Sequence, residues 1–308
     1  GTEKAQQAVE LPHSDKFVVA DGAVVFTDKL GRDVSISQKP QRVIILDYNA
    51  LDLWYHAGGT AVGRTGHILV DSRADEDEMG SEIKNVPIMN EAHDPVNIEM
   101  IVAQEPDLII ISPTNKTHLE AVESFEQYNI PYFAWDYDDF DGFIENLELF
   151  TLLNDRGDLY EKYASDNIIR VNAVREKISG QEPVTMVMLL PHATNGIYAL
   201  ANSGYLGNLC EDMNLENIAG VETSTVVSIE SLLDIDPEWI FSRGGSGDGS
   251  EANAKAIFES YPLWSELTAV KEGRFQHLPA ELFLYHANTR YADAYEYLAN
   301  LVYPQIFN

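Results

Sequence analysis

Arginine and tyrosine residues follow several predicted strands of this chain, and these two residue types together suit the binding of an anionic ligand. A guanidinium offers forked N–H donors that fit carboxylate oxygens, and an aromatic ring supplies flat contact area. The three arginines are Arg64, Arg243 and Arg290, and the three tyrosines are Tyr48, Tyr137 and Tyr285. Because the chain carries many acids, each arginine alone is equally well explained as a surface ion-pair partner. These residues are therefore candidates for a binding site, to be judged by where the fold places them.

Other polar side chains follow the same predicted strands. Ligands of open parallel sheets bind beyond the carboxyl ends of the strands. That rule adds Asp47, Asn49, Thr65, His67, Thr114, Asn115, Asp136, His192 and His286. A bare zinc or manganese ion would need three or four histidine or carboxylate ligands to converge. Four residues, His67, His192, His286 and Asp136, could supply such ligands only if the lobes bring them together, and we predict no metal site.

The sequence lacks the short motifs that mark common enzyme classes. It contains no G-x-S-x-G elbow, no nucleotide-binding glycine fingerprint and no H-E-x-x-H. The glycine-rich stretch 243–249 lacks the pattern of a phosphate-binding loop, and the pair His93 and Asp94 has no nucleophile beside it. We predict a binding protein and no enzymatic activity. A surface sensor or adhesion module that reuses the same fold is the alternative.

Charge and cysteine content exclude several classes of partner. The chain has 20 Lys and Arg against 50 Asp and Glu, a net charge of −30. A nucleic-acid partner needs a basic surface, so none is expected. The single cysteine, Cys210, excludes an internal disulfide, and its apolar neighbours predict a buried structural thiol. No apolar run approaches the ~20 residues of a membrane span.

Strands and helices alternate along the chain, which is typical of an α/β protein with mainly parallel sheets. Predicted strands are 43–46, 60–62, 108–111, 132–135, 184–190, 239–242 and 275–278, with a hairpin at 24–26 and 34–36. Predicted helices are 50–57, 140–150, 206–213 and 291–301, and the acidic stretch 71–82 is predicted to be an exposed loop.

One pattern occurs twice and indicates two related lobes. Residues 96–110 and 227–241 each read as a cap residue, a short helix, a proline-marked turn and a buried strand. Between the two copies, apolar residues recur at three- and four-residue steps over 155–179, the spacing of one long helix. We therefore predict an N-terminal lobe at 1–153 with a tether at 1–22. A connecting helix at 154–180 and a C-terminal lobe at 181–308 follow.

Several runs together resemble one family. They are TDKLGRDVSISQKPQRVIIL, the paired IE…P(D/E)xI segments, PLWSELTAVKEGRFQHLP and the terminal LVYP, spread over residues 24–304. These runs are similar to those of the extracytoplasmic substrate-binding proteins of ABC importers for ferric siderophores, haem and cobalamin. The resemblance implies two Rossmann-like lobes with mainly parallel sheets, joined by a single long helix, with the ligand in a cleft between the lobes.

The resemblance also implies partners and a location. A glutamate on each lobe docks onto the permease in that family, and these positions fall on Glu99 and Glu230. The expected protein is an extracytoplasmic monomer that works with an ABC permease and its ATPase, and a lipid anchor is its only link to the membrane. First-turn glutamates are also favoured by the helix dipole, which is the simpler explanation of each acid alone.

Among the ligands of that family, a ferric siderophore or similar iron chelate fits the arginines and tyrosines above, because such complexes are often anionic with aromatic or amide-rich arms. No resident cofactor is expected. Haem is the alternative, with His67, His192, His286 or Tyr285 as an axial ligand on iron. Cobalamin would rest on aromatic contacts that the tyrosines offer. Relatives that bind bare metal carry a long His-rich loop, and this sequence has none.

Overall fold

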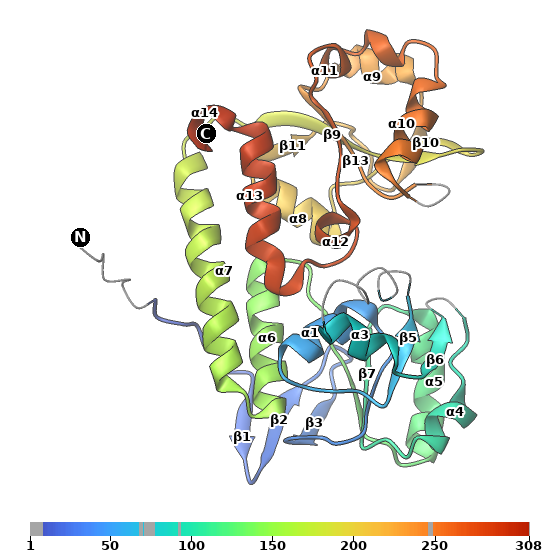
Figure 1. Cartoon of the computed structure of the whole chain (residues 1–308), viewed down its shortest axis with the longest axis vertical. Coiled ribbons are helices and arrows are strands. Elements are labelled where there is room, and N and C mark those ends of the chain that lie inside the picture. The colour runs from blue at the N-terminus through green and yellow to red at the C-terminus, as the bar shows by residue number, and fades with distance from the viewer. Residues whose placement is uncertain (1–8, 68–69, 71–77, 92–93, 246–248, 308) are drawn as a thin grey trace. The chain divides into compact units, whose positions relative to one another are not determined.

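The computed structural model describes residues 9–67, 70, 78–91, 94–245 and 249–307 (Figure 1). The chain divides into two units, Gly1–Asn167 and Ile168–Asn308. The division falls inside α7 (Gly157–Ile178), a helix of 22 residues. A continuous helix therefore belongs in part to each unit, and the predicted helix at 155–179 matches it closely.

The main sheet of the first unit is parallel throughout. Its strand order is β6-β5-β4-β7-β8, and every neighbouring pair is parallel. The strands are β4 (Val43–Ile45), β5 (Gly63–Gly66), β6 (Ile88–Glu91), β7 (Leu108–Ile111) and β8 (Tyr132–Ala134). All residues of β4, β7 and β8 are buried, as expected where helices cover both faces of a parallel sheet.

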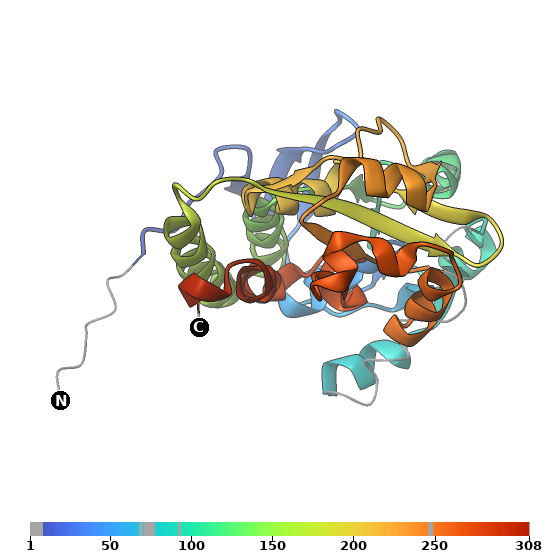
Figure 2. The ribbon, with the colours of Figure 1, turned by 90° about the horizontal axis from the view of Figure 1, so that it is seen from above.

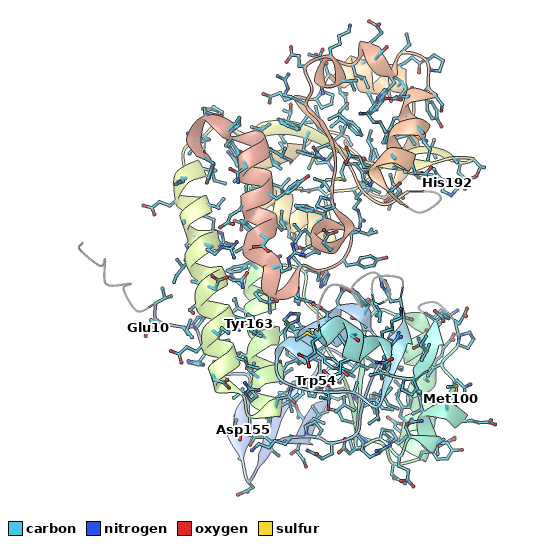
Figure 3. All side chains as sticks on the ribbon, viewed as in Figure 1. Glu10, Trp54, Met100, Asp155, Tyr163 and His192 are labelled. Carbon is cyan, nitrogen blue, oxygen red and sulfur yellow. The ribbon has the colours of Figure 1, made fainter. Side chains whose placement is uncertain are left out.

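The described helices of the first unit that precede α7 are α1 (Tyr48–His56), α3 (Glu78–Lys84), α4 (Ile98–Ala103), α5 (Lys116–Gln127) and α6 (Phe140–Asn154). Short polar residues cap α1, α4, α5 and α6. Asp47, Asn97, Asn115 and Asp139 each accept a backbone N–H bond at the start of α1, α4, α5 and α6. Within the core, Trp54 of α1, which is labelled in Figure 3, packs edge-on against Phe150 of α6.

A small antiparallel sheet precedes the main one. Its strands are β1 (Val18–Ala20), β2 (Ala23–Thr27) and β3 (Asp33–Ser37), and β2 and β3 form the predicted hairpin. Phe26 of β2 packs edge-on against Phe133 of β8, which joins this sheet to the core of the first unit.

The second unit has a mixed sheet around one long strand, β9 (Val184–His192), the long yellow-green strand of Figure 2. Its order is β12-β10-β9-β13-β14, and β11 pairs with β9. The other strands are β10 (Gly196–Ala199), β11 (Leu215–Asn217), β12 (Thr225–Val227), β13 (Trp239–Ser242) and β14 (Phe275–His277). The strands β11, β13 and β14 run parallel to their neighbours, whereas β10 is antiparallel to β9 and β12.

Helices alternate with and follow these strands along the chain. They are α8 (Gly204–Asp212), α9 (Ile229–Ile235), α10 (Glu251–Glu259), α11 (Thr268–Lys271), α12 (Ala280–Phe283), α13 (Tyr291–Val302) and α14 (Pro304–Phe307). Short 3₁₀ turns lie at Trp264–Glu266 and Asn288–Arg290. One core cluster includes Phe258 of α10 stacked on Trp264, with ring centroids 4.5 Å apart.

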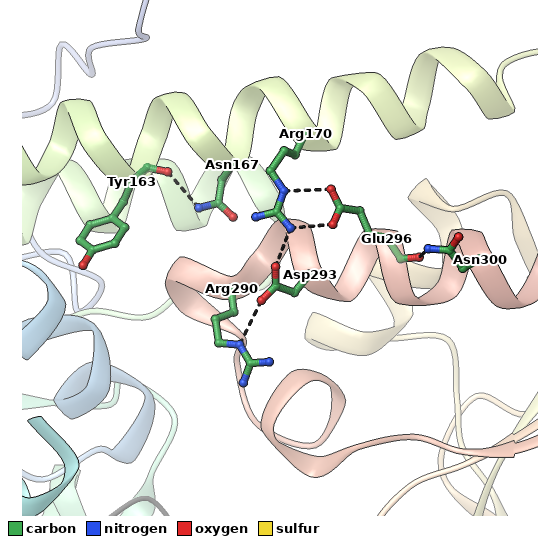
Figure 4. A network of polar contacts seen from close by, with 7 residues as sticks. All are labelled: Tyr163, Asn167, Arg170, Arg290, Asp293, Glu296 and Asn300. Carbon is green, nitrogen blue, oxygen red and sulfur yellow. Dashed lines mark hydrogen bonds and ion pairs between the residues drawn. The ribbon is translucent and has the colours of Figure 1, made fainter. Parts of the chain in front are cut away.

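An ionic network joins the C-terminal part of α7 to α13 (Figure 4). Arg170 binds both carboxylate oxygens of Glu296, at 2.8 and 2.6 Å, and also reaches Asp293 at 2.6 Å. Arg290 donates to the second oxygen of Asp293 at 3.1 Å. A guanidinium held by two carboxylates fixes the angle between the helices as well as their contact.

The predicted α/β class with mainly parallel sheets is confirmed, while two local predictions were wrong. The second strand of the first lobe is β5, at Gly63–Gly66, and not 60–62. A side chain at Gly63 would place its Cβ 2.8 Å from Met89 and 3.0 Å from Ile44, so β5 needs glycine there. Within the stretch predicted as an exposed loop, residues 78–82 belong to α3, and 71–77 lie outside the described residues.

Candidate ligand-binding site

An aromatic pair lies at the carboxyl end of the sheet in the first unit. Tyr48 begins α1 directly after β4, and its ring stacks on His67 with centroids 4.0 Å apart and planes at 18°. Burial lowers the pKa of His67 to about 4, so its imidazole is neutral at neutral pH. The pair therefore presents flat, uncharged rings next to the strand ends.

Two carboxyl groups share this edge. Asp47 caps α1 by accepting from Ala50 N at 3.0 Å, and burial raises its pKa. The pKa of Asp136, beyond β8, is raised to about 6 by burial, then by Asp138, while Lys29 opposes the shift and Asp47 adds to it. The carboxyl ends of β4 and β8 thus place acids close enough to influence each other.

Other predicted residues of this unit occupy different settings. Thr114 is exposed, and its N–H donates to Ser112 Oγ at 3.2 Å. Asn115 caps α5, and Tyr137 is buried against Phe143. Thr114 is exposed and Asn115 is half-buried, whereas the binding role predicted for Tyr137 would require a ligand to reach a covered ring.

The three predicted arginines differ in their partners. Arg64 lies within β5, is 3% exposed, and donates to the carbonyls of Thr65 at 2.9 Å and Lys84 at 3.1 Å. Arg290 is exposed and paired with Asp293. Arg243 follows β13, is half-buried, and its guanidinium has no hydrogen-bond or ion-pair partner anywhere in the part of the chain that the structure describes.

Arg243 lines a pocket of about 80 Å³ that lies wholly within the second unit. Burial lowers the pKa of the guanidinium, while Cys210 and Tyr285 oppose that shift. The thiol of Cys210 is 1% exposed, as predicted, and burial raises its pKa to about 12. At neutral pH, therefore, Arg243 is the charged group of the pocket and Cys210 is a neutral wall.

The predicted histidines of the second unit occupy contrasting positions. His286 lies beside the ring of Tyr205, with centroids 4.7 Å apart, and burial lowers its pKa to about 4. His192 stands at the turn end of the β9–β10 hairpin, where the N–H of Asn195 donates to its Nδ1 at 3.2 Å (Figure 3). Among the described residues, no group of three or more His, Cys, Asp or Glu side chains is arranged to hold a metal ion.

Glu99 and Glu230 occupy matching positions in the two units. Each is an exposed residue in the first turn of a short helix, α4 or α9, directly before a buried strand. Asn97 and Ser228 cap these helices through bonds of 3.0 and 3.1 Å. The repeated pattern of the sequence is therefore a repeated structure that presents one carboxylate on each unit.

Sequence reasoning missed part of the Arg243 pocket. Its wall includes Asn202, Ser203 and Ser224, which lie before α8 and before β12. The rule selects residues directly after parallel strands, and it does not reach these positions. Residues 202–203 follow the antiparallel β10, and Ser224 lies well beyond the end of β11, just before β12. A run of small polar residues at 202–204 before a helix was the available signal.

Comparison with known proteins decides the family. Residues 43–282 match the periplasmic binding protein family. The chain belongs to this family. It is 25% identical over 229 residues to the vitamin B12-binding protein of Vibrio campbellii, covering 72% of this chain and 79% of that one. It is 24% identical over 262 residues to the Fe(3+)-citrate-binding protein YfmC of Bacillus subtilis, covering 81% and 76%.

A solved structure shows the same fold. The TroA-like periplasmic binding protein FepB of Veillonella parvula superposes with a TM-score of 0.73 at 20% identity, covering 92% of this chain and 91% of that one. The resemblance inferred from the sequence is thus confirmed: the chain is of the substrate-binding type that serves ABC importers. This is a family of transport-binding proteins and not a class of enzymes. Within the described residues, none of the helices combines the length and apolar character that crossing a membrane requires.

Proposed function

We propose that this protein is the extracytoplasmic substrate-binding component of an ABC importer, and that it captures a ferric siderophore or similar iron chelate. The observation that carries the ligand class is Arg243, a half-buried cation without a partner among the described residues. Ferric chelates with carboxylate or catecholate arms are anionic, and such oxygens are the acceptors that a guanidinium fits. The relative named for Fe(3+)-citrate supports the same assignment.

The proposed contacts come from the strand-end residues of each unit. Arg243 supplies charge, and the stacked rings of Tyr48 and His67 supply apolar area. The further proposed ligand-binding residues are Arg64, Thr114, Tyr137, His192, Tyr285, His286 and Arg290. Arg64 and Arg290 already have partners, so each would have to share its guanidinium with the ligand.

Delivery rests on a second set of residues. Glu99 and Glu230 dock onto cationic side chains of the permease, which works with its ATPase. Their exposure and their repeated placement, one carboxylate on each unit, support this role. The protein acts as a monomer held at the membrane by a lipid anchor.

Haem or cobalamin is the second candidate ligand. The low pKa of His67 and of His286 favours haem, since a neutral imidazole binds iron without first losing a proton. The relative named for vitamin B12 favours cobalamin. Haem would give a Soret band on titration that the variant His286→Ala or His67→Ala loses.

The test of the proposed function is a melting-temperature screen of the purified protein with ferric citrate, a ferric catecholate, haemin and cobalamin. A bound ligand at one hundred times its dissociation constant stabilises the fold by ~2.7 kcal/mol. Stabilisation by a ferric chelate is the expected result. Stabilisation by haemin or cobalamin alone would move the assignment to the second candidate, and no response to any of the four would contradict the proposal.

A further inference from the structure

The pocket beside Arg243 has a lining that separates into two kinds of surface. One part is apolar and buried, formed by Met186 and Met188 of β9 and by Leu206 and Cys210 of α8. The other part is polar and comes from residues 202–203, Ser224 and Arg243. A buried wall facing a polar rim is the usual form of a site that holds one functional group of a ligand.

The polar side chains of this pocket have unused hydrogen-bonding capacity. Ser203 is the cap residue of α8, yet its side chain makes no cap bond. Within the described ranges, the side chains of Asn202, Ser203, Ser224 and Arg243 have no hydrogen-bond partner in the protein. By contrast, the side chain of Asn217 in the same pocket has two hydrogen-bond partners in the protein. It donates to Leu200 O at 3.0 Å and accepts from Ala219 N at 3.1 Å.

Arg243 needs an acceptor more than the other residues do. Its Nε is covered from solvent and has no acceptor among the described residues. A donor that is covered and unpaired loses its bond to water without replacement, and that loss is larger for a charged group. The Arg243 side chain lines the pocket, so an anionic oxygen placed there would pair with the charge of the guanidinium.

One glycine allows two parts of the pocket wall, Asn202 and α8, to lie close together. A Cβ on Gly207 would lie 2.7 Å from the carbonyl carbon of Asn202, so the segment before α8 can lie this close only against glycine. The pocket volume of about 80 Å³ exceeds that needed for a single water several-fold. It suits a group of a few atoms and is far too small for a porphyrin or corrin ring.

We infer that this pocket is the subsite for one carboxylate arm of the iron chelate, with Arg243 as the ionic partner and the hydroxyl and amide groups of Ser203, Ser224 and Asn202 as its neutral donors. This inference rests on the proposed function and deepens it. It predicts selectivity among ferric chelates: those with a free carboxylate arm bind through the pocket, and neutral chelates do not use it.

The test compares two probes on four forms of the full-length chain. The probes are ferric citrate, which carries carboxylates, and a neutral ferric trihydroxamate, and their affinities are measured by isothermal titration calorimetry. The forms are the wild type, Arg243→Gln, Ser203→Asp and the control Arg274→Gln. Ser203→Asp places a competing carboxylate at the pocket and keeps the fold, because aspartate is a favoured helix cap. Arg274 is outside the pocket and already paired with Glu272.

Arg243→Gln and Ser203→Asp should each weaken ferric citrate by about tenfold to hundredfold. Arg274→Gln should leave its affinity unchanged, and any affinity for the neutral probe should be equal in all four forms. Equal affinity of wild type and both pocket variants for ferric citrate would overturn the subsite and leave the proposed function intact. Failure of the wild type to bind ferric citrate while it binds the neutral probe would also overturn the subsite alone. Failure of the wild type to bind any iron chelate would overturn both.

Discussion

The two units end their parallel strands in side chains of opposite chemistry. In the first unit the strand ends bring together Asp47 and Asp136, and the nearby Arg64 is buried and bonded to backbone carbonyls. In the second unit the group after β13 is Arg243, whose guanidinium has no partner in the described part of the chain. The position of an arginine after a strand therefore does not show whether it is structural or able to bind a ligand. Its hydrogen-bond partners in the fold do.

Both units carry an exposed glutamate at the same position of the repeat, and its removal should have the largest effect. The variant Glu99→Ala with Glu230→Ala should reduce uptake of the ferric chelate by cells to the background level, because both carboxylates that we propose dock onto the permease are gone. Affinity of the purified variant for the chelate should not change. Uptake of radiolabelled iron and calorimetry measure the two quantities.

The matched control for the docking variant is Glu123→Ala with Glu259→Ala. It removes the same charge from exposed positions on α5 and α10. Normal uptake by the docking variant, or equal loss in the control, would show that the repeated glutamates have no specific role.

The contrast between the arginines predicts a difference in stability. Arg64→Met should lower the free energy of unfolding by about 2–3 kcal/mol, because the carbonyls of Thr65 and Lys84 lose buried donors. Arg243→Met should change it by less than ~0.5 kcal/mol, since no protein partner is lost. Urea unfolding followed by circular dichroism measures both. Equal losses would mean that Arg243 is as structural as Arg64.

The acidic edge of the first unit predicts a smaller, pH-dependent effect. Asp136 has a pKa raised to about 6, so the folded state holds its proton more tightly than the unfolded state, in which the pKa is 3.8. Its contribution is complete below about pH 4 and is lost as the pH rises through about 6. Asp136→Asn should therefore gain stability relative to wild type over that range, by about 1 kcal/mol after allowance for the exposed part of the side chain. Melting curves at pH 4 and pH 7 would show it, and a constant difference would contradict the shift.

The sequence correctly predicted those strands in which a run of apolar residues coincides with burial in the fold. Residues 43–46 and 108–111 are apolar throughout and became central parallel strands. It misplaced β5, because 60–62 has the residues typical of a strand while Gly63–Gly66 contains two glycines and an arginine. A side chain in place of Gly63 would meet Met89 and Ile44, and neither of these close neighbours is visible in the local sequence.

The site could be predicted only in part, for a similar reason. The rule that ligands bind beyond the carboxyl ends of parallel strands selected Arg243 and Tyr48. Whether the guanidinium of an arginine already has a partner in the fold can, however, depend on long-range contacts. The bond of Arg290 to Asp293 spans three residues and could have been read from spacing. The hydrogen bond from Arg64 to Lys84 O joins residues that are twenty positions apart in the sequence. The absence of a partner for Arg243 among the described residues depends on the whole surrounding fold.

The central claim is that an anionic oxygen of the ligand completes the hydrogen bonding of Arg243. Its most direct test is a crystal structure of the protein with ferric citrate bound. The account predicts a carboxylate oxygen of the chelate within hydrogen-bond distance of the Arg243 guanidinium, in the pocket beside α8. A chelate bound elsewhere, with Arg243 still lacking an anionic partner, would contradict it.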